Sequence, residues 1–141
     1  MKKILIVNAN YYNDITKNLV FSASKILKKK KFKIYVLDVA GVFELPFAIK
    51  KNINRYDAFI AIGCVIKGKT PHFDLICKSS FDAIMNLSIN YNKPIGNGII
   101  TALSRKQALE RSRKINSKKP NKGLEAAHAV ISILKNGPKE I

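Results

Sequence analysis

The stretch "DAFIAIGCVIKGKTPHFD", residues 57–74, joins an uninterrupted apolar run to a segment of glycine, lysine, threonine, proline and histidine. The apolar run, residues 58–66, lacks the alternation of apolar and polar side chains that marks a half-exposed strand, so it predicts a strand buried on both faces. The polar segment predicts a turn and then the start of a helix. The stretch therefore predicts a strand–turn–helix unit of a parallel α/β fold.

The same alternation of apolar runs and amphipathic segments extends over the whole chain, and it predicts one α/β domain over residues 1–141 with right-handed crossovers. Asp14, Thr70 and Ser104 are the expected N-caps of three helices. The segment "RKINSKKPNKG", residues 113–123, reads as a basic connector within this domain. The expected strands cover residues 3–9, 32–39, 57–66 and 93–101, and the expected helices cover residues 14–31, 43–53, 71–90, 104–112 and 121–135.

The composition excludes several function classes. The net charge is +17, from 26 basic and 9 acidic residues, but no nucleic-acid-binding motif accompanies it, so we expect no specific nucleic-acid partner. The apolar run Ile4–Val7 is too short for a signal peptide and no run approaches a membrane span, so we expect a cytoplasmic protein without a membrane partner. Cys64 and Cys77 form no CxxC pair and are expected to be reduced core thiols. The two histidines stand far apart, so we expect no metal site.

The loop after the strand that ends near Ile66 carries the most suggestive chemistry, because ligands of parallel sheets bind beyond the carboxyl ends of the strands. Gly68 permits a tight turn and a close approach of a ligand to the backbone. Lys69, Thr70 and the N–H groups of the following helix start could hold a phosphate. His72 in the first helical turn could then act as a general base. A plain helix start with an incidental histidine explains the same residues equally well.

Other strand ends add candidates with alternatives of their own. Glu44 could bind hydroxyl groups of a ligand, although a first-turn helix acid needs no ligand. Tyr11 and Tyr12 follow the first strand, where one ring could stack on a flat heterocycle while the other packs on the sheet edge. Arg111 is a good phosphate ligand in type, but an isolated arginine on a helix is usually solvated.

Four blocks of sequence occur in a recognisable order: "GVFELP" (41–46), "GCVIKGKTPHFD" (63–74), "QALERS" (107–112) and "NKGLEAA" (121–127). Together they resemble the lumazine synthase family of riboflavin biosynthesis, and the resemblance runs from about Ile4 to Lys135. It implies a flavodoxin-like three-layer αβα sandwich around a four-stranded parallel sheet. It also implies condensation of 5-amino-6-(D-ribitylamino)uracil with 3,4-dihydroxy-2-butanone 4-phosphate, without a metal or organic cofactor. Pentamers in which two neighbours share each active site are the implied assembly.

The resemblance also implies site residues. His72 matches the catalytic histidine, and Glu44 lies in the segment that holds the ribityl chain. Arg111 matches an arginine that reaches the phosphate from the adjoining subunit. Asn97 stands where members usually carry an aromatic residue offered by the neighbour. The implied substrate-binding residues are Tyr11, Val42, Phe43, Glu44, Cys64, Val65, Ile66, Lys69, Thr70, Asn97, Arg111 and Lys122. An anion- or flavin-binding oligomer that has kept the fold and lost turnover is the competing interpretation.

Overall fold

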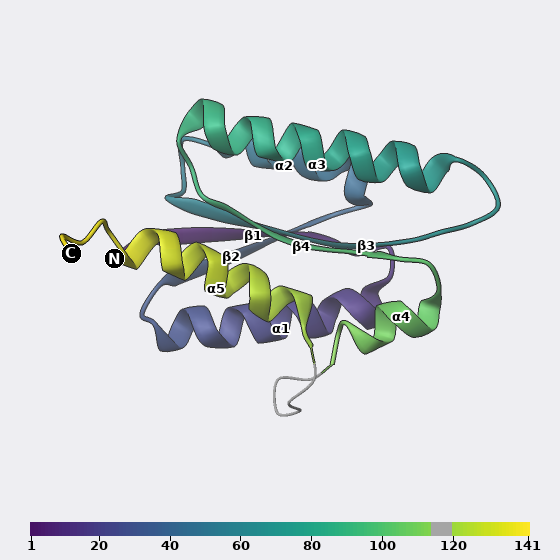
Figure 1. Cartoon of the computed structure of the whole chain (residues 1–141), viewed down its shortest axis with the longest axis horizontal. Helices are drawn as coiled ribbons and strands as arrows, with labels where there is room; N and C mark the ends of the chain where they lie inside the picture. The colour runs from purple at the N-terminus through teal and green to yellow at the C-terminus, as the bar shows by residue number, and fades with distance from the viewer. Residues whose placement is uncertain (114–119) are drawn as a thin grey trace.

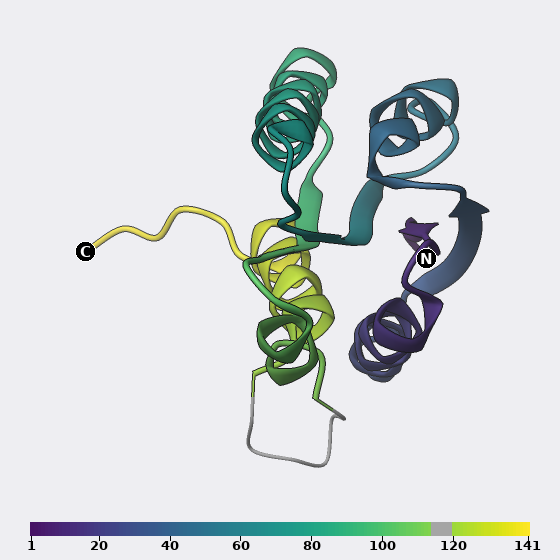
Figure 2. The ribbon, with the colours of Figure 1, turned by 90° about the vertical axis from the view of Figure 1, so that its right-hand side faces the viewer.

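The computed structural model of the chain describes residues 1–113 and 120–141. Four parallel strands form one sheet, in the spatial order β2 (Lys33–Val39), β1 (Lys3–Ala9), β3 (Ala58–Ile66) and β4 (Ile95–Ala102). Helices cover both faces of this sheet, three on one side and two on the other (Figure 1, Figure 2). This arrangement confirms the predicted three-layer α/β fold. One face carries α1 (Asn13–Lys29), α4 (Arg105–Glu110) and α5 (Lys122–Lys135), and the other carries the 3-10 turn η1 (Val42–Glu44), α2 (Leu45–Lys51) and α3 (His72–Tyr91).

Two apolar cores lie on opposite faces of the sheet. Side chains alternate along a strand, so Ile4 and Ile6 of β1 belong to the core on the face of α1, α4 and α5, whereas Leu5 and Val7 belong to the core on the face of α2 and α3. In β3 every residue except the last, Ile66, is buried. Burial on both faces is the reason that the central strands show no polar alternation in the sequence.

Strand register places the carboxyl ends of the strands at one edge of the sheet. Ala9 of β1 pairs with Val39 of β2, and Ile66 of β3 pairs with Ala102 of β4. The loops after these strands therefore emerge side by side, as the predicted site requires.

Two of the three predicted helix caps are wrong. Tyr12, not Asp14, occupies the N-cap of α1 and makes no side-chain cap, because the helix begins at Asn13. Asp14 lies in the first turn and forms an ion pair with Arg105 of α4. Helix α3 begins at His72, so Pro71 rather than Thr70 is its N-cap, although the Thr70 hydroxyl still accepts a 3.4 Å hydrogen bond from the His72 backbone N–H.

The Ser104 cap is confirmed, since its Oγ accepts a 3.2 Å hydrogen bond from the Gln107 backbone N–H. Most of the predicted basic connector, residues 113–123, lies outside the described residues. Within residues 1–113 and 120–141, no helix combines the length and the apolarity that a membrane crossing needs.

Candidate active site in two pockets

A pocket of about 360 Å³ lies at the carboxyl edge of the sheet, where the segments after β1 and β2 meet the last residues of β3. Each of these segments supplies part of the wall, and the first turns of α3 close it. Most of the residues proposed from the sequence as one half of the site therefore converge here, although they come from four separate stretches of chain. We call it the His72 pocket; it is lined by Tyr11, Tyr12, Gly41, Val42, Phe43, Glu44, Cys64, Val65, Ile66, His72 and Ile76.

Gly63 sets how closely η1 packs on β3. A Cβ at this position would lie only 2.6 Å from Val42 Cγ2 and 3.3 Å from the Ala9 Cβ, so a larger side chain would push η1 away from the strand. The absent side chain lets Val42 and the following residues reach the pocket wall. The apolar stretch that predicts β3 thus also positions the segment containing Glu44.

The two tyrosines after β1 have different environments. Tyr12 packs against the core beneath α1, whereas Tyr11 is 76% exposed. Their rings meet edge to face, with centroids 4.9 Å apart and planes at 89°. Tyr12 therefore braces the loop, and Tyr11 is the ring that can still offer a face to a ligand.

The loop between β3 and α3 lies beside the pocket rather than in its wall. Lys69 and Thr70 are exposed and do not line it. A Cβ added at Gly68 would meet no atom of the described residues within 4 Å, and no glycine among those residues has a positive φ. The backbone at Gly68 therefore does not require a glycine, and the open space leaves room for a ligand near the backbone.

Burial raises the pKa of the Cys64 thiol to about 11, an effect that Arg105 partly opposes and Asp14 slightly reinforces. The pKa of Cys77 is also raised, first by burial and then by Asp74. Both cysteines are free, as predicted. The thiolate is the reactive form of a cysteine. Cys64 therefore forms part of the pocket wall and does not act as a nucleophile at neutral pH.

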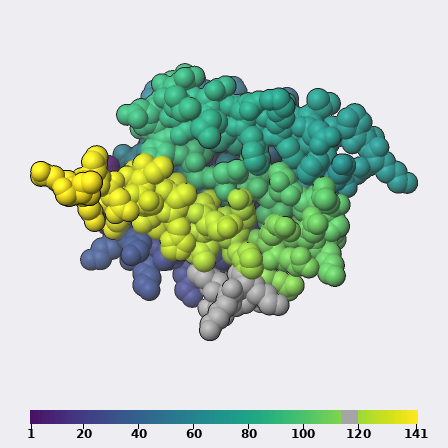
Figure 3. All heavy atoms as spheres, in the orientation of Figure 1, coloured from purple at the N-terminus to yellow at the C-terminus, as the bar shows by residue number. Residues whose placement is uncertain are grey.

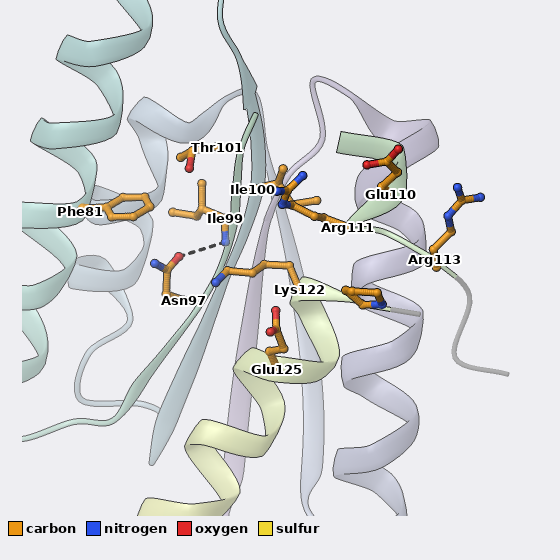
Figure 4. A pocket seen from close by; sticks show the side chains of 11 residues that line it. Phe81, Asn97, Ile99, Ile100, Thr101, Glu110, Arg111, Arg113, Lys122 and Glu125 are labelled. Carbon is orange, nitrogen blue, oxygen red and sulfur yellow. Dashed lines mark hydrogen bonds between the residues drawn. The ribbon is translucent and has the colours of Figure 1, made fainter. Parts of the chain in front are cut away.

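A second pocket, of about 630 Å³, lies along the outer edge of β4. On the face seen in Figure 3, α3 lies above this edge and α4 and α5 lie below it. Figure 4 shows acidic and basic side chains from α4 and α5 around the opening. We call it the Arg111 pocket; it is lined by Phe81, Asn97, Ile99, Ile100, Thr101, Glu110, Arg111, Arg113, Pro120, Lys122 and Glu125.

Backbone hydrogen bonds hold the basic residues of this pocket together. The Lys122 N–H donates to the Arg111 carbonyl at 2.9 Å, and Ser112 forms an antiparallel bridge with Asn121. Asn121 is also the N-cap of α5, since its Oδ1 accepts from the Leu124 N–H at 2.9 Å. These bonds connect the start of α5 to the end of α4 and thereby hold Arg111 and Lys122 at the opening of the same pocket.

Asn97 lies on the outer edge of β4, and its side chain bonds to its own strand. The Oδ1 accepts a 3.0 Å hydrogen bond from the Ile99 backbone N–H (Figure 4). This bond satisfies a donor at a strand edge that no other described strand of the chain covers. The acceptor atom of Asn97 is therefore already engaged.

The two sets of candidate residues line different pockets of the chain. Asn97, Arg111 and Lys122 line the Arg111 pocket and not the His72 pocket, and the resemblance assigns Asn97 and Arg111 to a neighbouring subunit. Sequence reasoning missed Phe81 and Glu125, because a phenylalanine in an amphipathic helix is read as a core residue and a first-turn glutamate as a helix acid. In the described parts of the chain no group of three or more potential ligands could hold a metal ion.

Comparison with known sequences assigns the family. Residues 1–136 match the family described as 6,7-dimethyl-8-ribityllumazine synthase. The chain belongs to this family. A 6,7-dimethyl-8-ribityllumazine synthase of Campylobacter jejuni subsp. doylei is 40% identical, with 99% of this chain and 91% of the relative covered. The enzyme of the same name from Bartonella bacilliformis is 36% identical, with 94% and 90% covered.

A third relative, from Methylorubrum populi, is 37% identical and carries the same name, with 94% of this chain and 80% of the relative covered. The match extends across β1 to α5 and therefore includes both pockets. The family resemblance inferred from the four sequence blocks is confirmed.

Proposed function

We propose that this chain is a transferase that condenses 5-amino-6-(D-ribitylamino)uracil with 3,4-dihydroxy-2-butanone 4-phosphate. The products are 6,7-dimethyl-8-ribityllumazine, phosphate and water, as in riboflavin biosynthesis. Family membership over residues 1–136 supports the reaction. The observation that carries it to this chain is the convergence of Tyr11, Glu44 and His72 in one pocket beyond the strand ends.

In this proposal the His72 pocket holds the pyrimidine substrate. Tyr11 stacks on the pyrimidine ring. The backbone at the end of β3, Cys64–Ile66, binds the polar edge of the same ring. Glu44, with Val42 and Phe43, holds the ribityl hydroxyl groups. All of these residues line one pocket, which supports a single substrate lying across them.

The phosphate of the second substrate binds between two copies of the chain. Lys69 and Thr70 lie beside the His72 pocket on one copy, and Arg111 and Lys122 come from the Arg111 pocket of the next. These residues lie at two different pockets of one chain, so one chain cannot place all of them around the same phosphate, and a second copy is needed. Their separation therefore supports a site shared between two copies. We propose a ring of five copies, in which each interface is head-to-tail and the ring closes.

The chemistry consists of addition of an amine to a ketone, departure of phosphate and closure of a ring, with a proton transfer at each stage. Holding two reactants together contributes up to about 7–11 kcal/mol in favourable cases. One positioned base adds roughly 10²- to 10⁴-fold, which is the share we assign to His72. The reaction as written uses no metal or organic cofactor.

The test is direct. Purified protein is incubated with both substrates, and lumazine fluorescence is followed together with phosphate release. Stoichiometric appearance of both products supports the proposal. Binding of the substrates without either product would instead favour the competing interpretation, an oligomer that has kept the site and lost turnover.

Two further expectations belong to this proposal. We infer that residues 1–141 form one domain, which the family match over residues 1–136 supports. We also infer a cytoplasmic location, since the amino-terminal apolar run is β1, a buried strand of the sheet.

A further inference from the structure

Phe81 lies in the Arg111 pocket beside Asn97, although no sequence block pointed to it. It belongs to α3, and its ring extends toward Asn97 and Ile99 of β4 (Figure 4). The side chain is partly buried, because one part of it packs against the core beneath α2 and α3. The remaining part of the ring forms a wall of the pocket.

Phe81 is the one aromatic residue among the described residues that line this pocket. Ile99 and Ile100 are each only 1% exposed, so they offer almost no apolar surface to a ligand. The other lining side chains are mostly charged or polar, among them Arg111 and Lys122. A flat apolar face is therefore available from Phe81 and from no other described side chain of the wall.

Asn97 cannot provide such a face. Its Oδ1 is bonded to the Ile99 N–H, and an amide side chain has no ring and little apolar area. In this chain, the residue at the position where the family resemblance implies an aromatic side chain thus accepts a hydrogen bond from the edge of β4. Phe81 brings a ring into the same pocket from a different element, α3.

We propose that Phe81 takes the place of the missing aromatic at position 97 and contacts the heterocycle of the pyrimidine substrate bound by the adjoining copy. The inference rests on the proposed function, because the substrate and the shared site are those of that reaction. Phe81 is then a substrate-contacting residue, and its ring closes the heterocycle from the side opposite Tyr11.

The expected effect follows from the ring alone. An aromatic contact contributes enough to change affinity about two- to tenfold beyond the area it buries. Phe81→Leu keeps apolar volume against the core and removes the ring, so we expect it to raise the KM for the pyrimidine about two- to tenfold. Phe81→Tyr keeps the ring and should stay within about twofold of wild type. The KM for the butanone phosphate should change little in both variants.

Met85→Ala is the matched control. Met85 lies one turn further along α3 and is 60% exposed. It lines an adjoining apolar groove that Phe81 and Asn97 also border, but it does not line the Arg111 pocket. Its truncation should leave both KM values and the oligomeric state unchanged. An equal rise in KM for Met85→Ala and Phe81→Leu would show a general effect on α3 and would overturn the proposal.

A double-mutant cycle tests the exchange of positions. Asn97→Phe should rescue Phe81→Leu, returning the KM for the pyrimidine to within about twofold of wild type, and should improve the wild-type chain less, because a ring is already present there. Strictly additive effects, or an unchanged KM in Phe81→Leu, would overturn the proposal. A change in oligomeric state without a change in KM would assign Phe81 to the interface instead.

Equilibrium binding of the pyrimidine substrate alone separates this inference from the proposed function. If the wild-type chain forms no lumazine, the proposed function fails. The Phe81 inference is then judged by affinity: weaker binding of the pyrimidine by Phe81→Leu but not by Met85→Ala supports it, and unchanged or absent binding overturns it.

Discussion

The two pockets differ in how they are built. The His72 pocket is assembled from the loops that follow β1 and β2, the end of β3 and the first turns of α3, so its residues meet because parallel strands end at one edge. The Arg111 pocket lies on the flank of the sheet, along the outer edge of β4, and combines α3, the end of α4 and the start of α5. The first arrangement follows from topology, whereas the second depends on how particular helices pack.

This difference in construction suggests that the two pockets have different roles in the reaction. We propose that the His72 pocket supplies proton transfer and binds the pyrimidine, and that the Arg111 pocket of a neighbouring copy binds the phosphate and closes the site. Loss of the His72 base should therefore affect turnover, and loss of a group in the second pocket should affect binding.

His72→Ala should lower kcat by about 10²- to 10⁴-fold, the range expected for removal of one general base. Both KM values should change far less, because the imidazole acts mainly in the transition state. Steady-state kinetics by lumazine fluorescence checks this prediction. Wild-type turnover in the variant would remove His72 from the mechanism.

Mixing two impaired variants tests whether the pockets of different copies form one site. Arg111→Ala should raise the KM for the butanone phosphate roughly 10- to 100-fold, as expected for loss of a charge-assisted hydrogen bond. When His72→Ala and Arg111→Ala chains are unfolded together and reassembled at equal ratio, about one quarter of the sites in a head-to-tail ring combine two intact halves. Activity should rise toward about one quarter of wild type. No gain on mixing would show that each site lies within one chain.

Gly123→Ala should destabilise the half of the molecule that carries the Arg111 pocket. A Cβ at this position would lie 2.2 Å from the Leu19 carbonyl oxygen, so α5 would have to move away from α1. We expect the free energy of unfolding to fall by about 1–3 kcal/mol, as for overpacking in a core. Urea denaturation measures the change. Gly137→Ala is the control, since no atom of the described residues lies within 4 Å of a Cβ at that position and its effect should be within about 0.5 kcal/mol of zero.

The buried Cys64 thiol should make stability depend on pH above neutrality. Burial raises its pKa in the folded chain from 9.0 to about 11, so between these values the unfolded chain binds fewer protons than the folded chain. The free energy of unfolding should therefore fall as pH rises from about 9 to about 11. Urea denaturation at about pH 8 and about pH 10 should show a smaller fall for Cys64→Ala than for wild type. An identical fall in both proteins would contradict the assignment.

The Asp14–Arg105 ion pair should have the smallest effect on stability. It joins α1, the helix after β1, to α4, the helix after β4. Both side chains are about half exposed, so solvent screens the attraction. Asp14→Asn should cost no more than about 1 kcal/mol, and the loss should shrink as salt is added. Thermal unfolding at low and high ionic strength measures it. A larger, salt-independent loss would mean that Asp14 has a different role.

Much of the fold could be predicted from the sequence, because its signals are local. The uninterrupted apolar runs of β1 and β3 reflect burial on both faces, and the 3.6-residue pattern of α1 reflects burial on one. Helix ends were less predictable. Asp14 has a suitable side chain for an N-cap, but α1 begins one residue before it, at Asn13, and its N-cap is Tyr12, which packs against the core.

The candidate site likewise has features that can be predicted from the sequence and features that cannot. The residue types that can perform the chemistry are visible in the sequence, and the order of strands and helices implies that Tyr11, Glu44 and His72 meet at one edge. The placement of Arg111 and Lys122 in a separate pocket, the bond of Asn97 at the edge of β4 and the ring of Phe81 beside it are visible only in the folded chain. Strand and helix signals act between near neighbours in the chain, whereas Phe81 and Asn97 meet only because α3 packs across β4.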